Sequence, residues 1–133
     1  MTRYVEVKGA SFPEANKNTH LKVAPLKKWQ VLCGDSKHWR TGIYSPSASN
    51  INDIEELEKH SCPELFLLLE GELTLVLEEN KKLVELKLQK GLPVLVDSFH
   101  SGYCPNGAHT GKAFIVERDE FITEYRAVKD LTS

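Results

Sequence analysis

Three short apolar runs between residues 64 and 89 constrain the fold more than any other part of the sequence. The runs read ELFLLLE, ELTLVLEE and KLVELKLQ, and they are separated by Gly71 and by the polar pair Asn80 and Lys81. In the third run, apolar residues alternate with Glu85 and Lys87, which is the period of a strand with one buried face. Runs of this length between short turns indicate antiparallel hairpins.

Similar runs elsewhere in the sequence extend this pattern. Strands are predicted in KKWQVLC, HWRTGIY, PVLVD and KAFIVE, while RDEFITEYRAVKD fits a last strand or a short helix equally well. SPSASNINDIEEL is predicted to be a surface loop, or a mobile cover over a site, with room for one helical turn. The first twenty residues are expected to be irregular. Seven or eight short strands in 133 residues predict one all-β domain, a sandwich or barrel spanning 1–133.

Charge and composition exclude several classes of protein. Seventeen basic and nineteen acidic residues give a formal charge of −2. The sequence has no long Lys/Arg run of the kind that binds nucleic acid, so a nucleic-acid partner is not expected. The apolar stretches are too short to cross a membrane, and MTRYVEVKGA lacks the apolar segment of a secretory signal. The three cysteines form no Cys-x-x-Cys pair and suit a reducing compartment. A cytoplasmic location is therefore expected.

The segment EKHSCPELFLLLEG carries the clearest chemical signal. His60 is followed after three residues by Glu64, and Glu64 after six residues by Gly71. This spacing resembles the first motif of the cupin superfamily, His-x-His, three or four residues, Glu, six residues, Gly. Glu58 occupies the position of the first motif His. If the backbone is extended here, the side chains at 58, 60, 62 and 64 point to one side.

A second segment, GLPVLVDSFHSGY, resembles the second cupin motif. Gly91 and His100 match its two ends, and the turn between them, DSF, is two residues shorter than the family pattern. The resemblance covers residues 39–117. It implies a cupin-type double-stranded β-helix, or jelly-roll barrel, with His60, Glu64 and His100 as metal ligands. Two imidazoles and one carboxylate suit Fe(II), Mn(II), Ni(II) or Zn(II), and they leave coordination positions open.

Five further residues are candidates for the site, and Glu58 is the candidate for proton transfer. Cys62 and Cys104 share the parity of the predicted ligands, although buried, inert cysteine is the commoner case. His109 is an alternative ligand to His100 and an alternative proton-transfer group. Arg40 and Tyr103 are candidates for holding an anionic substrate, or else they are structural. Glu58 equally fits a solvated acidic turn.

The resemblance leaves the reaction open. The first hypothesis is a metal-dependent enzyme, of oxygenase or isomerase type, acting on a small polar metabolite. The alternatives are a non-catalytic cupin that binds a small molecule or a metal, and a barrel with a vestigial site that is kept for assembly. A homodimer is expected in each case, because pairing through sheet edges protects exposed strands.

Overall fold

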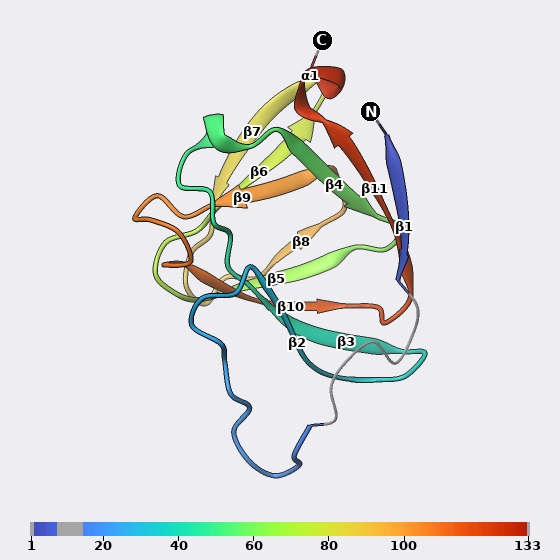
Figure 1. Ribbon diagram of the computed structural model, residues 1–133, viewed down its shortest axis with the longest axis vertical. Helices are drawn as coiled ribbons and strands as arrows, with labels where there is room; N and C mark the ends of the chain where they lie inside the picture. The colour runs from blue at the N-terminus through green and yellow to red at the C-terminus, as the bar shows by residue number, and fades with distance from the viewer. Residues whose placement is uncertain (1, 8–14, 133) are drawn as a thin grey trace.

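Two antiparallel sheets face each other in the computed structural model, which describes residues 2–7 and 15–132 (Figure 1). The strands are β1 (Arg3–Val7), β2 (Trp29–Asp35), β3 (Trp39–Tyr44), β4 (Glu56–His60), β5 (Glu64–Glu70), β6 (Thr74–Glu79), β7 (Lys82–Lys87), β8 (Val94–Val96), β9 (His100–Tyr103), β10 (Lys112–Glu117) and β11 (Phe121–Ala127). The larger sheet has the order β1-β11-β4-β9-β6-β7, and the smaller one has the order β2-β3-β10-β5-β8. Two short helical turns complete the described chain, η1 (Ile51–Asp53) and α1 (Val128–Leu131).

The predicted hairpin punctuation is present in the structure. The β6–β7 hairpin turns at Asn80 and Lys81, which both have positive φ, at 52° and 66°. Positive φ at both central residues is what a two-residue hairpin turn of type I′ requires. The helical turn η1 lies in the predicted loop, and its first residues are capped by the Asn50 side chain, which accepts a hydrogen bond from the backbone of Asn52.

Three expectations from the sequence need correction. The described residues form eleven strands rather than seven or eight, because β1, β4 and β9 were missed. The first twenty residues are not all irregular, since Arg3–Val7 pairs with β11; residues 8–14 lie outside the described part of the chain. The C-terminal segment was expected to form either a strand or a short helix, but it contains both, because β11 is followed directly by α1.

The chain also bends between β4 and β5. Ser61 and Cys62 form the bend, and Pro63 follows it, so residues 58 to 64 are not one extended strand. As a result His60 belongs to the larger sheet and Glu64 to the smaller one. The two residues therefore approach the interior from opposite sides.

An apolar cluster fills the space between the sheets. Its buried members are Phe66, Leu68, Leu73, Leu75, Leu88, Val96, Cys104, Ala113 and Ile115. Phe66 and Ile115 also line a cavity, so the cluster borders directly on the site described below. Within the residues that the structure describes, no helix has the length and apolarity needed to cross a membrane.

Candidate metal centre

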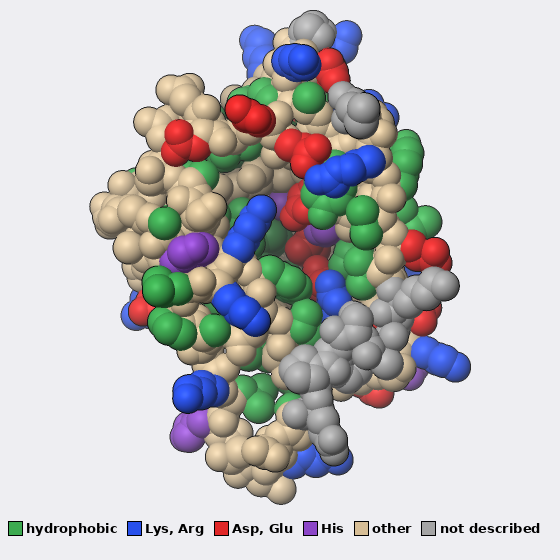
Figure 2. Space-filling model, in the orientation of Figure 1, with side chains coloured by type: hydrophobic (Ala, Val, Ile, Leu, Met, Phe, Trp, Pro, Cys, Tyr) green, Lys and Arg blue, Asp and Glu red, His purple; other side chains and the backbone are tan. Residues whose placement is uncertain are grey.

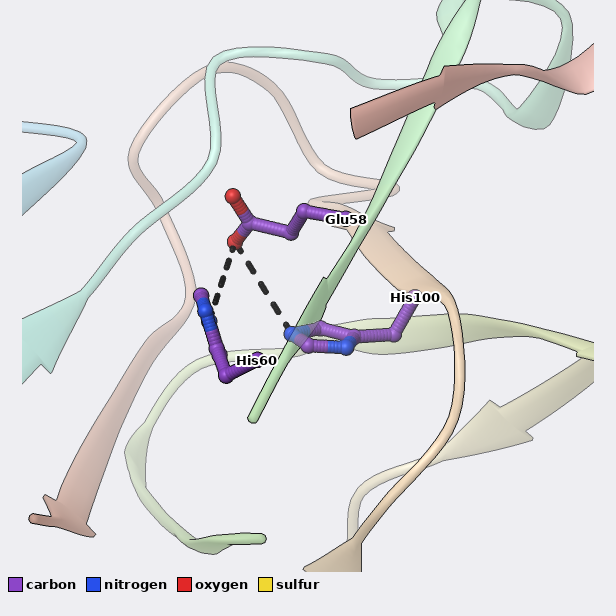
Figure 3. Close-up of side chains that lie close together, drawn as sticks. All are labelled: Glu58, His60 and His100. Carbon is purple, nitrogen blue, oxygen red and sulfur yellow. Dashed lines mark ion pairs between the residues drawn. The ribbon is translucent and has the colours of Figure 1, made fainter. Parts of the chain in front are cut away.

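Two neighbouring strands of the larger sheet place three potential ligands on its inner face. Glu58 and His60 lie two residues apart on β4, and Glu58 is the direct partner of His100 on β9. Side chains two residues apart on a strand, or directly opposite on adjacent strands, share a face. The Oε1 atom of Glu58 lies 3.8 Å from Nε2 of His60 and 3.8 Å from Nε2 of His100 (Figure 3).

Glu64 reaches the same point from the smaller sheet. Its Oε1 atom lies 2.5 Å from Nε2 of His60 and 3.2 Å from Nε2 of His100. Glu64 is only 5% exposed, yet Oε1 accepts no well-aligned hydrogen bond from the described residues. A buried carboxylate oxygen without a hydrogen-bond donor is costly.

The Nδ1 atom of each imidazole already has a hydrogen-bonding neighbour. Nδ1 of His60 lies 2.8 Å from the hydroxyl oxygen of Thr123, and Nδ1 of His100 donates a hydrogen bond of 2.9 Å to the carbonyl oxygen of Ser98. Because a carbonyl oxygen can only accept, the neutral His100 ring carries its proton on Nδ1 and its lone pair on Nε2. This is the arrangement in which proteins present histidine to a metal ion.

Burial and close contacts shift the pKa values of Glu64 and His100. Burial favours the neutral form of Glu64, but its contacts with His100 and His60 outweigh burial and lower its pKa to about 2. Burial likewise opposes the charged form of His100, but the Glu64 carboxylate beside it raises the pKa of that ring. Burial, with the Glu58 carboxylate as the next cause, raises the pKa of Tyr125 to about 12.

A second buried carboxylate, missed in the sequence, lies beside this group. Glu117 on β10 offers an oxygen that lies within 4.8 Å of ligand atoms of His60 and Glu64. Its Oε2 atom accepts a hydrogen bond of 2.6 Å from Nε of Arg40. Burial and the negative charge of Glu64 raise the pKa of Glu117 to about 7. In the sequence, its spacing is the only indication: Glu117 lies two and four residues after the apolar Ile115 and Ala113, and therefore on the same face of a strand.

These side chains open into a cavity of about 350 Å³. Its walls include the aromatic residues Trp29, Tyr44, Phe66, Phe121 and Tyr125. An adjoining cavity of about 270 Å³ shares part of this lining and extends toward the loop that contains η1. Figure 2 shows a hollow with acidic and histidine side chains inside it and basic side chains near its rim. A small molecule can therefore reach the carboxylates and imidazoles.

The donor atoms fit a divalent transition-metal ion. Metal–ligand bonds of about 2.0–2.2 Å place neighbouring donor atoms roughly 3–4 Å apart. The separations of 3.2 and 3.8 Å lie in that range, and the 2.5 Å contact between Glu64 and His60 would have to widen by about half an ångström. The buried oxygen of Glu64, which accepts no aligned hydrogen bond from the described residues, would then be a ligand.

The remaining predicted site residues lie in different places. Arg40 lines the cavity, where it is buried and paired with Glu117. Tyr103 does not, because its hydroxyl donates to Glu85 on the outer surface. Tyr103 therefore lies outside the lining of this cavity.

Neither cysteine nor His109 joins the group of ligand atoms. Cys104 is buried in the apolar cluster, where Gly111 donates a hydrogen bond to its Sγ, and Cys62 is buried at the bend after β4. His109 lies in the loop before β10, and its Nδ1 donates to the carbonyl oxygen of Ser45. The structure thus places these three residues outside the groups of ligand atoms and outside the cavity lining.

Comparison with known proteins supports the fold. No protein-family model matches the sequence, and no curated protein matches it. Among solved structures, iron(II) HppE in complex with its substrate is similar with a TM-score of 0.56 at 15% identity, over 78% of this chain and 62% of that one. A cupin-2 domain protein from Shewanella frigidimarina NCIMB 400 is similar with a TM-score of 0.52 at 14% identity, over 72% and 84% of the two chains.

These likenesses define the class of fold. The two sheets and the neighbouring structures confirm the predicted all-β, cupin-type jelly roll. At identities of 14–15% the likeness concerns the fold alone, and this chain spans about three-fifths of the length of HppE. The ligand roles of His60, Glu64 and His100 stay a prediction, which the geometry above makes specific.

Proposed function

We propose that this protein holds one divalent ion, Fe(II), Mn(II), Ni(II) or Zn(II), between His60, Glu64 and His100, and that it acts as an enzyme on a small polar molecule. The observation that carries the proposal is the buried Oε1 atom of Glu64, which faces two Nε2 atoms and has no aligned hydrogen-bond donor among the described residues. A metal ion is the partner that satisfies all three atoms at once.

The chain's own residues would divide the work. A bound divalent ion would supply a Lewis acid, or a binding position for dioxygen, at the inner end of the cavity. Thr123 and Ser98 hold the two imidazoles so that their Nε2 atoms face inward. The aromatic wall excludes water and packs against the apolar part of the molecule that binds there.

Glu58 is the residue that we assign to proton transfer. Its side chain is 33% exposed, whereas those of His60, His100 and Glu64 are at most 8% exposed. It lines both cavities, so a molecule held beside the ligands is within its reach. A carboxylate at this position can take a proton from the bound molecule and return it to another of its atoms.

Reconstitution tests this function. The chelator-treated protein is loaded with each of the four ions, and oxygen uptake and isomerisation are followed over panels of thiols, diketones and sugar phosphates. We expect one ion to support turnover, and Glu58→Gln to lower kcat by about 10²–10⁴-fold while metal content stays unchanged. The control is Glu79→Gln, which removes an exposed carboxylate at the end of β6.

The same experiment separates the alternatives. Stoichiometric metal and measurable binding of a panel compound, without turnover by any loaded form, would favour the non-catalytic binding protein. Absence of metal from every reconstituted sample would favour the barrel with a vestigial site.

A further inference from the structure

Glu117 faces the candidate ligands although the motif resemblance gives it no role. It ends β10, and it is 5% exposed on the same face of that strand as Ala113 and Ile115, which are fully buried. An acidic side chain in such a position is rare unless something compensates its charge. The positive charge that compensates the Glu117 carboxylate therefore has to come from inside the barrel.

The potential ligand atoms form two overlapping groups. One group is Glu58, His60 and His100; the other is His60, Glu64 and Glu117, and within each group the ligand atoms lie within 4.8 Å of one another. His60 belongs to both groups, and Oε1 of Glu64 also lies 3.2 Å from Nε2 of His100. The two groups therefore surround one volume, with Glu58 and Glu117 coming from opposite sheets.

Arg40 fixes the Glu117 carboxylate in place. The two residues are direct partners on β3 and β10, and Nε of Arg40 lies 2.6 Å from Oε2 of Glu117. The guanidinium group is itself held against aromatic rings, 5.1 Å from the centre of Phe121 and 5.7 Å from that of Trp29. Arg40 therefore holds the Glu117 carboxylate beside the candidate ligands.

Acidic side chains outnumber basic ones in the lining of this volume. The carboxylates of Glu58, Glu64 and Glu117 line the cavity, and so do the basic side chains of Arg40 and Lys28. With both imidazoles neutral, as metal ligands must be, three ionised acids against two basic side chains leave one net negative charge in a partly enclosed space, which is costly. A divalent cation offsets this negative charge.

We propose that Glu117 is a ligand of the ion bound by His60, Glu64 and His100, with Arg40 as its positioning residue; this inference rests on the proposed metal site. The ion is then bound by imidazole nitrogens from the larger sheet and by carboxylates from the smaller one. Glu117 adds an oxygen ligand, and oxygen ligands suit Mn(II) better than Zn(II), which is usually four-coordinate in proteins.

Metal titration of the full-length protein tests this assignment. Mn(II) and Zn(II) affinities are measured by competition with a chelator for the wild type, Glu117→Gln and Glu117→Asp. The Gln variant keeps the size and loses the charge; the Asp variant keeps the charge beside Arg40 but shortens the side chain by one methylene. Glu70→Gln, an exposed change on the neighbouring strand β5, is the matched control.

We expect both Glu117 variants to lower the Mn(II) affinity at least tenfold, the Zn(II) affinity by a smaller factor, and Glu70→Gln to change neither. The visible absorption of the Co(II)-loaded protein adds a readout that a merely structural role would not move, because loss of a ligand changes the coordination number and hence the band intensity. If Glu117→Gln and Glu117→Asp bind Mn(II) like the control, the assignment is overturned while the metal site stands. If the wild type binds none of the four proposed ions, the metal site itself is refuted, and the role of Glu117 with it.

Discussion

The hydroxyl group of Thr123 lies 2.8 Å from Nδ1 of His60, its direct partner across β4 and β11. Thr123 is buried, so water cannot easily replace this contact. The contact turns the other ring nitrogen, Nε2, toward Glu64. A side chain that does not touch the ion thus sets the orientation of a proposed ligand.

Replacing this hydroxyl tests the orientation of His60. Thr123→Val has nearly the same shape and removes the partner of Nδ1, so we expect metal affinity to fall about 10–100-fold. Thr123→Ser keeps the hydroxyl and should stay close to the wild type. Chelator competition gives the affinities, and equal affinity for the Val and Ser variants would show that the hydroxyl does not orient the ring.

The pH dependence of stability in the metal-free protein follows from Glu117 and His100. The pKa of Glu117 is raised from 4.5 to about 7, so between these pH values the folded state keeps a proton that the unfolded state loses. Stability therefore falls as pH rises through this window, by at most about 1.4 kcal/mol per pH unit for one proton. His100, whose pKa is also raised, acts in the same direction as pH rises.

Urea unfolding of the chelator-treated protein between pH 5 and pH 7.5 measures this slope. Glu117→Gln has no proton to lose at this position, so its stability should change less over that range. Glu64 acts in a different window: its pKa is lowered to about 2, so its contribution is lost only as pH falls below about 4.5. A wild-type stability that rises from pH 5 to pH 7 would contradict the account of Glu117.

The two glycines that matched the cupin spacing have different structural reasons. Gly71 and Gly91 both have positive φ, at 69° and 84°. A Cβ atom at position 71 would lie 2.1 Å from the carbonyl oxygen of Thr110, whereas one at position 91 would meet nothing within 4 Å. Alanine should therefore cost about 1–2 kcal/mol at position 91, through backbone strain alone.

At position 71 the same substitution adds a backbone clash, so we expect Gly71→Ala to cost at least about 3 kcal/mol. The free energies of unfolding of the two alanine variants, measured in urea, give the comparison. Equal losses would mean that the approach of Thr110 to Gly71 is not maintained in solution.

Much of the fold could be predicted because the sequence carries local signals. Alternation in residues 82–89 and the polar turn at Asn80 and Lys81 predicted the β6–β7 hairpin that the structure contains. The strands β4 and β9 lacked such signals: they are short, and they carry His60 and His100 at positions where an apolar residue would mark a buried face. Polar residues that serve a site hide the period on which strand prediction depends.

Only the residues of the candidate site that match the motif spacing could be predicted from the sequence. His60, Glu64 and His100 were found from the motif resemblance, but the argument from parity along one strand failed for Glu64, because the chain bends at Ser61 and Cys62 and enters the other sheet. Pairing between distant strands, which brings Glu117 and Arg40 to the site, leaves no local pattern. The parity of Cys62 and Cys104 was equally uninformative, since buried thiols also pack into apolar surroundings.

The central claim is that His60, Glu64 and His100 bind one ion. The most direct measurement is the metal content per chain after reconstitution, for the wild type, His60→Ala, His100→Ala and the control His109→Ala, whose ring lies outside the site. We predict about one ion per chain in the wild type and the control, and close to none in the other two variants. No metal in the reconstituted wild type, or full metal content in His60→Ala and His100→Ala, would contradict the claim.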